Sequence, residues 1–293
     1  MRWTWGALAA LIVLAGPAAA QQQQPGQRDP FNGQFGIMEI AQPPLEAARQ
    51  ARLMGEALAA LQPQRPGQVD TYLVVAGLWS DPVFEREAKQ AEEILRAHFG
   101  AQGRSILLSA GGDGVRNYPA ATPANISAAI GQVGSLIDRD EDLVVVFITS
   151  HGSPDGSAAM REHNRLGGSL RPTHLRDMLV GAGVRSRVII VSACFSGAFI
   201  APLMDENTIV LTAAAPDRTS FGCQPQNNWT FFGDALFNQN LRNGGALLPA
   251  FDRAKTLIER WEREQNLTPP SNPQRHVGAR AADLVQRAER AAR

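Results

Sequence analysis

The sequence predicts an α/β fold in which a mostly parallel sheet is covered by helices on both faces. From Val69 onward, short apolar runs rich in β-branched residues alternate with longer amphipathic segments. Continuously apolar runs are typical of strands buried on both faces, and their alternation with helices is typical of parallel strands joined by crossovers. The sequence contains no internal repeat and no G-x-G-x-x-G after the first strand, so a dinucleotide site is not expected.

Five strands are predicted from the apolar runs. Each run is short and is bounded by turn residues, which favours a strand over a buried helix. The predicted strands cover residues 71–78, 104–109, 143–149, 187–192 and 207–214. A glycine-rich stretch, "AGGDG", follows the second of them and is predicted to be a loop.

The segments around these strands carry helix signals. Thr122 followed by Pro123 is expected to cap the helix over residues 122–137, because a threonine hydroxyl satisfies an unpaired N–H and proline suits a first turn. Asp81 and Pro82 begin another helix in the same way. Further helices are predicted over residues 43–62, 83–99, 172–183, 230–244 and 247–265, and an Ala/Arg-rich helix is predicted near the C-terminus.

Composition and charge exclude some classes of partner. The chain has 293 residues, 44% of them apolar, and its 28 basic and 28 acidic residues cancel. A neutral chain without a basic cluster is not expected to bind nucleic acid. Two cysteines, Cys194 and Cys223, are too few for a disulfide framework in a protein of this length.

The first twenty residues resemble a secretory signal peptide. Arg2 precedes the apolar run "GALAALIVLAG", and Ala18-x-Ala20 provides small residues for cleavage near Ala20. We therefore expect a secreted or periplasmic protein without a stable membrane anchor after cleavage; a retained N-terminal anchor is the alternative. The predicted organisation is a signal peptide (1–20), a flexible arm with a helix (21–68), the main domain (69–265) and a C-terminal tail with a helix (266–293).

Two strand ends carry residues with reactive side chains. "VVVFITSHG" ends at His151 and Gly152, and "VIIVSACFSG" ends at Cys194 and Gly197. Ligands of open α/β sheets bind at the carboxyl ends of the strands, where these two motifs are expected to meet. A thiol beside an imidazole is the minimum equipment of a cysteine nucleophile, and the N–H groups of Gly152 and Cys194 suit an oxyanion hole.

Each of these residues has a plainer interpretation when it is seen alone. A cysteine at a strand end is more often a small core residue, and a histidine is more often a structural group. The combination of both, each followed closely by glycine, favours a catalytic pair. Cys223 either pairs with Cys194, which would silence a nucleophile, or stays free beside it; a structural role is predicted for it.

The two motifs resemble those of the legumain family, the C13 cysteine peptidases, including its bacterial secreted members. That family has an apolar run into an H-G dipeptide and a second run into E-A-C-E-S-G. The later "TAAAPDRTSFGC" is similar to the family's T-A-A-N-P-R-E-S-S-Y-A-C, and "TFFGDALF" is similar to its T-Y-L-G-D-W. The resemblance covers residues 70–245, with four segments in the same order.

The resemblance implies a caspase-like three-layer sandwich and a peptidase that forms an acyl-enzyme on Cys194. His151 would activate the thiol or protonate the leaving amine, and Gly152 and Cys194 would hold the oxyanion. By position, Thr219, Ser220 and Asp234 would belong to the pocket for the substrate's P1 residue. The implied partner is a protein or peptide substrate, and the mechanism requires neither a metal nor another cofactor.

Departures from the family pattern leave the P1 preference open between Asn or Asp and a basic residue. Ser192 replaces the family's acid two positions before the nucleophile, and the family's pocket arginine aligns with Glu85 or, after a slip of one residue, with Arg86. Glu85 together with Asp234 would favour a P1 Lys or Arg. A transpeptidase that shares the acyl-enzyme and a non-catalytic binding module that retains the fold are the alternative functions.

Overall fold

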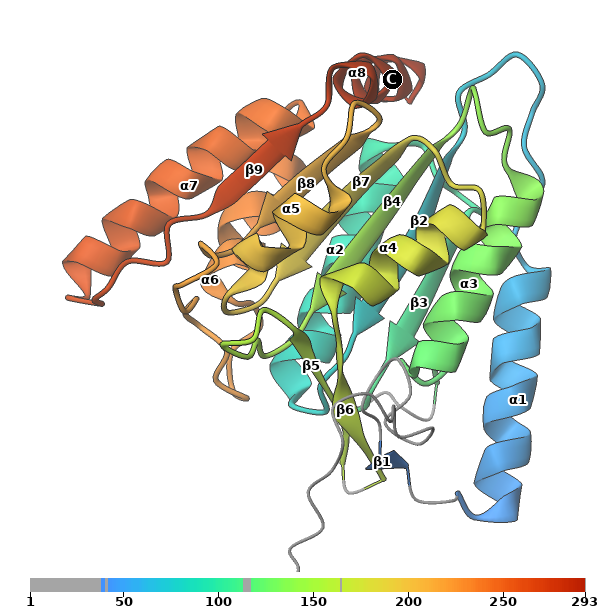
Figure 1. The fold of residues 1–293 in the computed structure, drawn as a ribbon, viewed down its shortest axis with the longest axis horizontal. Helices are drawn as coiled ribbons and strands as arrows, with labels where there is room; N and C mark the ends of the chain where they lie inside the picture. The colour runs from blue at the N-terminus through green and yellow to red at the C-terminus, as the bar shows by residue number, and fades with distance from the viewer. Residues whose placement is uncertain (1–37, 40–41, 113–116, 164, 293) are drawn as a thin grey trace, which may run out of the picture.

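A six-stranded, mostly parallel sheet forms the centre of the molecule. The computed structural model describes residues 38–39, 42–112, 117–163 and 165–292. The strand order of the sheet is β3-β2-β4-β7-β8-β9 (Figure 1), and only the edge strand β9 runs antiparallel to its neighbour. The predicted signal peptide, and the arm up to residue 37, lie outside the described residues.

All five predicted strands are confirmed, with ends that shift by at most two residues. The strands of the large sheet are β2 (Thr71–Gly77), β3 (Ser105–Ser109), β4 (Leu143–Thr149), β7 (Arg187–Ser192), β8 (Thr208–Thr212) and β9 (Gln274–Val277). A second sheet, not predicted, has the order β1-β6-β5 and consists of β1 (Met38–Glu39), β5 (Ala158–Glu162) and β6 (Leu166–Leu170).

Helices cover both faces of the large sheet, which confirms the three-layer sandwich (Figure 1). One face packs against α1 (Pro44–Ala59), α3 (Pro123–Leu136), α4 (Pro172–Gly181) and α5 (Ile200–Leu203). The other packs against α2 (Pro82–His98), α6 (Phe231–Gly233), α7 (Leu247–Glu264) and α8 (Ala279–Ala291). Side chains along each strand alternate between the two cores: Tyr72 points into one, and Leu73 into the other. Thr122 caps α3 as predicted, because its hydroxyl accepts from the Asn125 N–H.

The helix predicted over residues 230–244 is wrong as a single element. The chain there forms α6, a π-helical turn (Asp234–Asn238) and a 3₁₀ turn (Leu241–Asn243). Polar side chains compete for the backbone in this segment: the Asn240 amide donates to the Ala235 carbonyl, and Asp234 accepts from the side chain of Asn238. Such local bonds offer the backbone an alternative to a regular helix.

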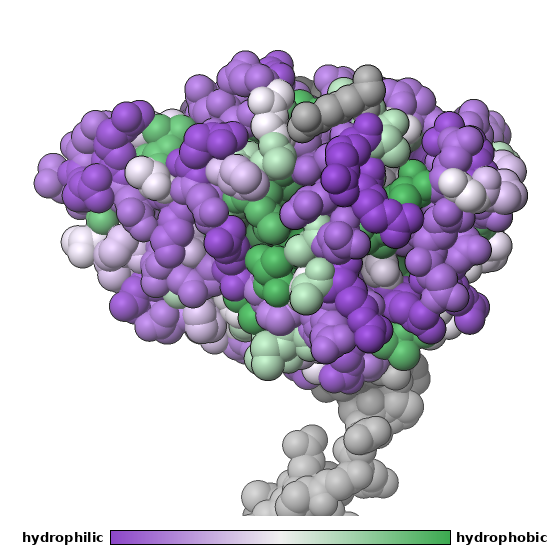
Figure 2. Space-filling view, turned by 90° about the horizontal axis from the view of Figure 1, so that it is seen from above, coloured by the Kyte–Doolittle hydropathy of each residue, from purple (hydrophilic) through white to green (hydrophobic). Residues whose placement is uncertain are grey.

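The C-terminal segment joins the main body of the structure. After residue 266 the chain adds β9 to the edge of the sheet, and α8 buries Ala281, Leu284 and Val285 in the second core. Figure 2 shows the end of the molecule where α8 lies, a mostly hydrophilic face with small apolar patches near its centre. None of the helices in the described part of the chain is long and apolar enough to cross a membrane.

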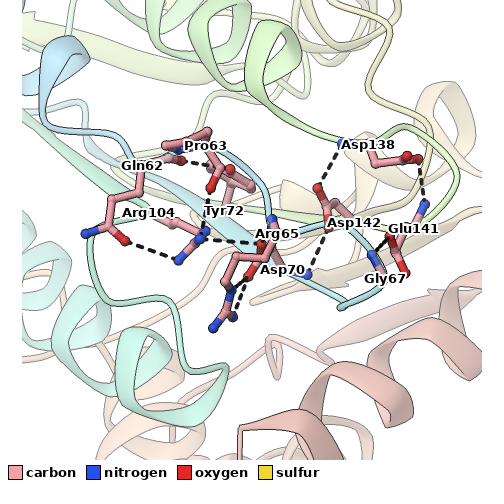
Figure 3. Close-up of polar contacts among 10 residues, drawn as sticks. All are labelled: Gln62, Pro63, Arg65, Gly67, Asp70, Tyr72, Arg104, Asp138, Glu141 and Asp142. Atoms are coloured by element: carbon pink, nitrogen blue, oxygen red, sulfur yellow. Dashed lines mark hydrogen bonds and ion pairs between the residues drawn. The ribbon is translucent and has the colours of Figure 1, made fainter.

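A buried carboxylate pair anchors the amino ends of β2 and β4 (Figure 3). Asp70 accepts from the backbone N–H of Arg65 and forms ion pairs with Arg65 and Arg104 at 2.6 and 3.4 Å. Asp142 accepts from the backbone N–H groups of Asp70 and Asp138 at 2.9 and 2.8 Å. Burial, with the negative charge of Asp70, raises the pKa of Asp142 from 3.8 to about 6.

This raised pKa predicts that the protein loses stability as the pH rises. Between about pH 4 and pH 6 the folded state holds a proton on Asp142 that the unfolded state has released, so the free energy of unfolding falls with pH in that range. The Asp142→Asn variant should lack this contribution. Urea unfolding of both proteins from pH 4 to pH 8 measures it: the wild type should lose stability relative to the variant, and parallel curves would contradict the assignment.

Candidate active site

Strand register places the two strand-end motifs, which carry His151 and Cys194, next to each other. Thr149 of β4 pairs with Ser192 of β7, and the Ser150 N–H donates to the Ser192 carbonyl at 3.0 Å. His151 and Cys194 follow this pair, each two residues beyond it. The backbones then touch: a Cβ added at Gly152 would overlap the carbonyl group of Cys194. Both motifs therefore lie at one point on the carboxyl edge of the sheet.

The Cys194 thiol lies in a tight turn against the loop that follows β8. The Ser220 N–H donates to Cys194 Sγ at 3.2 Å, and the Ser220 hydroxyl is 3.6 Å from the same sulfur. Phe195 adopts a left-handed backbone with φ of 58° and donates its N–H to the Arg218 carbonyl at 2.7 Å. A left-handed non-glycine residue is held only where its surroundings over-determine it. Residues 218–220 thus hold the turn at Cys194 and Phe195 through contacts with both of these residues.

The His151 imidazole is held by three residues from the turn after β2 and the start of α2. Trp79 and Phe84 contact the ring edge-to-face, with ring centroids at 5.0 and 4.8 Å. Asp81 Oδ2 lies 3.4 Å from His151 Nε2, and both side chains are partly exposed. A carboxylate on Nε2 favours the proton on that nitrogen and leaves Nδ1 as the basic one.

Asp81 is a site residue that sequence reasoning treated only as the start of a helix. It is the N-cap residue of α2, yet its side chain makes no capping hydrogen bond, which leaves the carboxylate to His151. One signal was available in the sequence. Asp81 follows the carboxyl end of β2, and parallel strands bring such ends to the same edge as the ends of β4 and β7.

The two backbone N–H groups predicted to form an oxyanion hole lie close together and without an acceptor among the described residues. Among the described residues, neither the Gly152 N–H nor the Cys194 N–H has a hydrogen-bond acceptor. They lie close together, since a Cβ at Gly152 would be 2.9 Å from the Cys194 nitrogen. Free donors held by a rigid backbone can stabilise a developing negative charge without reorganisation.

The comparisons with known proteins agree with this geometry. Residues 114–277 match the family model described as the peptidase C13 family. The chain belongs to the peptidase C13 family. It is therefore a cysteine peptidase of caspase-like fold. The structure is similar to the crystal structure of caspase-1 from Spodoptera frugiperda, with a TM-score of 0.50, 11% identity, and coverage of 74% of this chain and 93% of that one. No curated protein sequence matches the chain.

Two residues predicted for the substrate pocket of this C13 peptidase contact neighbouring strands and loops. Glu85 is buried and accepts from the Ser109 hydroxyl at 2.6 Å, beside the glycine-rich loop that follows β3. Arg86 donates to the carbonyls of Pro225 and Asn227. Arg86 thereby holds the loop beyond Cys223, and Glu85 supports the loop at Gly111 and Gly112.

The other predicted pocket residues of the C13 peptidase differ in how closely they approach Cys194. Ser220 contacts the sulfur, and its neighbour Thr219 is exposed. Ser192 is buried and forms a hydrogen bond with the Thr230 hydroxyl at 3.0 Å. Asp234 is partly buried and accepts from the side chains of Asn238 and Gln239. The structure brings Ser220 to Cys194, whereas the side chain of Asp234 forms hydrogen bonds with Asn238 and Gln239 of its own segment.

Cys223 lies near the nucleophile as a second free thiol. Burial raises the pKa of the Cys223 thiol, and the neighbouring Cys194 and Asp81 raise it further. The Cys223 thiol is therefore held in its protonated, weakly nucleophilic form.

A groove of about 420 Å³ lies beside the loop that holds Cys194. Its lining includes Arg218, which is part of that loop, and charged residues of both signs from α7, namely Glu259, Glu262 and Arg263.

Proposed function

We propose that this C13 peptidase is an endopeptidase that cleaves peptide bonds with a Cys194–His151 dyad. One observation carries the proposal: the pairing of Thr149 with Ser192 delivers both motifs to one point, with Gly152 packed on the backbone of Cys194. The turn that presents the thiol and the aromatic contacts that hold the imidazole support it.

The reaction proceeds through a thioester. Cys194 Sγ attacks the carbonyl carbon of the scissile bond, and the thiol proton passes to His151. The N–H groups of Gly152 and Cys194 stabilise the oxyanion. Collapse of the intermediate breaks the C–N bond, and His151 gives the proton to the leaving amine. Water then attacks the thioester with His151 as base, which releases the acid product and restores the thiol.

Asp81 orients the imidazole in this mechanism, because its carboxylate accepts the Nε2–H and so leaves Nδ1 for the reacting groups. We expect Asp81→Ala to lower kcat by about tenfold to a hundredfold, with a smaller effect for Asp81→Asn, whose amide oxygen still accepts. Steady-state kinetics on a peptide substrate measures both. Asp177→Ala, the loss of an exposed carboxylate on α4, is the control and should leave kcat unchanged; an equal lack of effect in Asp81→Ala would contradict the role.

The P1 preference depends on which charged side chains of the pocket are not engaged by other residues of the protein. Because Glu85 and Arg86 are engaged by Ser109 and by loop carbonyls, we propose that neither selects P1 by an ion pair. A P1-varied library of internally quenched peptides tests the activity and the preference together, with Cys194→Ala as the inactive control. Selection of Asn or Asp would place this protein with the legumain pattern, and selection of Lys or Arg would assign the pocket charge to Asp234.

We also propose that the protein is exported, since residues 1–20 have the pattern of a cleaved signal peptide. Expression in a bacterium followed by N-terminal sequencing of the periplasmic fraction tests this. A mature chain that begins near Gln21 is expected, and an uncleaved chain in the membrane fraction would indicate a retained anchor.

A further inference from the structure

Glu87 is a fully buried carboxyl group beneath the active site that the mechanism above does not use. It lies on α2 with 0% of its surface exposed. Phe84, one turn earlier on the same helix, contacts the His151 ring, and Asp81 at the start of the helix contacts its Nε2. Glu87 therefore belongs to the helix that holds the imidazole.

The carboxyl group of Glu87 reaches the start of α6. Its Oε2 accepts from the Thr230 N–H at 2.6 Å. Thr230 in turn caps α6, because its hydroxyl accepts from the Gly233 N–H at 3.0 Å. The fit is close, since a Cβ added at Gly233 would overlap the Glu87 carboxyl group. The path of the chain into α6 is thus set by Glu87.

The same carboxyl group lies at the ends of the two catalytic strands. The hydroxyls of Ser192, Thr230 and Thr149 lie close enough to favour its charged form. The Ser192 hydroxyl also forms a hydrogen bond with Thr230 at 3.0 Å. Thr149 and Ser192 are the paired residues that precede His151 and Cys194 by two positions. One side chain therefore contacts α2, α6 and the carboxyl ends of β4 and β7.

Burial disfavours the charged form of this group. It raises the pKa of Glu87 above its ordinary value, and the neighbouring Thr230, Ser192 and Thr149, which favour the charged form, do not offset it. A neutral carboxylic acid both donates and accepts, unlike a carboxylate. Its Oε1 and the Thr149 hydroxyl are buried atoms without a hydrogen-bond partner among the described residues. An unpaired buried oxygen costs less free energy on a neutral carboxyl group than on a carboxylate.

We propose that Glu87 is a positioning residue for the peptidase reaction. Its carboxyl group fixes the ends of β4 and β7 against helix α2, and it thereby positions His151 and Cys194. The inference rests on the proposed dyad. The C13 family has an acidic residue two positions before the nucleophile, and this chain has Ser192 there. In this chain the carboxyl group of Glu87 on α2 reaches Ser192 and Thr230 instead. A misplacement of catalytic groups by about 1 Å can cost about a hundredfold in rate, so loss of the Glu87 contacts should lower kcat.

Three variants of the full-length mature protein test the role. Glu87→Gln keeps the size, the neutrality and the paired donor and acceptor, so its kcat should stay within about threefold of the wild type. Glu87→Ala removes them and should lower kcat by about tenfold to a hundredfold with little change in KM. Glu92→Ala is the matched control: Glu92 is a buried carboxylate on the same helix, but it bonds to Ser105 away from the site, and kcat should not change.

The readouts are kcat and KM on a quenched peptide, normalised to the folded fraction, together with the rate at which iodoacetamide alkylates Cys194. A Glu87→Ala protein with wild-type kcat, or a Glu87→Gln protein as slow as Glu87→Ala, would overturn the proposal. If Glu87→Ala does not fold, Ser192→Ala removes the hydroxyl at the end of β7, and an unchanged kcat there would also overturn it. Activity that survives in Cys194→Ala would instead refute the dyad, which separates the two failures.

Discussion

Replacing Cys194 by alanine should abolish peptide hydrolysis and leave the fold intact. The thiol is the only group in the proposed mechanism that forms a covalent bond with the substrate, and loss of a nucleophile typically costs about 10⁴-fold to 10⁶-fold in kcat. The structural cost should be small, because Cys194 is a free, partly exposed cysteine whose sulfur contacts Ser220. We expect a change of less than about 1 kcal/mol in the free energy of unfolding.

Hydrolysis of a quenched peptide, urea unfolding and active-site titration measure these two effects separately. His151→Ala is expected to reduce kcat by about 10²-fold to 10⁴-fold, the usual contribution of a general acid or base. Cys223→Ala is the matched control for thiol loss, since the Cys223 thiol is held protonated, and it should retain activity. Full activity in Cys194→Ala would refute the dyad, whereas no hydrolysis by the wild type would leave the non-catalytic binding module as the better interpretation.

Gly152→Ala should inactivate the enzyme through the backbone. A Cβ at this position overlaps the carbonyl group of Cys194, and a backbone group cannot rotate away as a side chain can. The two strand ends must therefore separate, which displaces both the oxyanion donors and the nucleophile. We expect kcat/KM to fall by at least about a hundredfold and stability by about 1–3 kcal/mol.

Gly167→Ala provides the control for this substitution. Gly167 lies in β6, and a Cβ there meets no atom within 4 Å. Both variants add one methyl group, so only the crowding at Gly152 distinguishes them. Steady-state kinetics and thermal unfolding of the two proteins give the comparison. Equal activity in both would show that the ends of β4 and β7 are not packed as tightly as the structure indicates.

Strands and long helices were predictable because their signals are local. The run Leu143–Thr149 has no polar interruption, and all seven residues are buried. The hairpin of β5 and β6 escaped prediction because "LGGSL" has two glycines and little β-propensity. Its pairing depends on contacts with the rest of the chain, such as the Ala159 N–H that donates to the His151 carbonyl.

The candidate site likewise has residues that were predictable from the sequence and residues that were not. The motifs around His151 and Cys194 were visible because both reactive residues follow apolar strands and precede glycines. The partners of the imidazole were not visible, because Trp79 and Asp81 lie about seventy residues earlier and reach His151 only through the pairing of β2 with β4. The contacts of Glu85 with Ser109 and of Arg86 with loop carbonyls likewise depend on how loops pack against α2.

The sequence by itself determined the fold class and the strands, and it led to Cys194 and His151 as the proposed nucleophile and histidine, because apolar periodicity and strand-end motifs act over a few residues. The tertiary structure alone decided which groups surround them. Asp81, Ser220 and Glu87 come from three separate segments, and only the register of the sheet and the packing of α2 bring them to Cys194 and His151. Contacts between residues of separate segments produce no periodic pattern in the sequence, because they are made across strands and not along the chain.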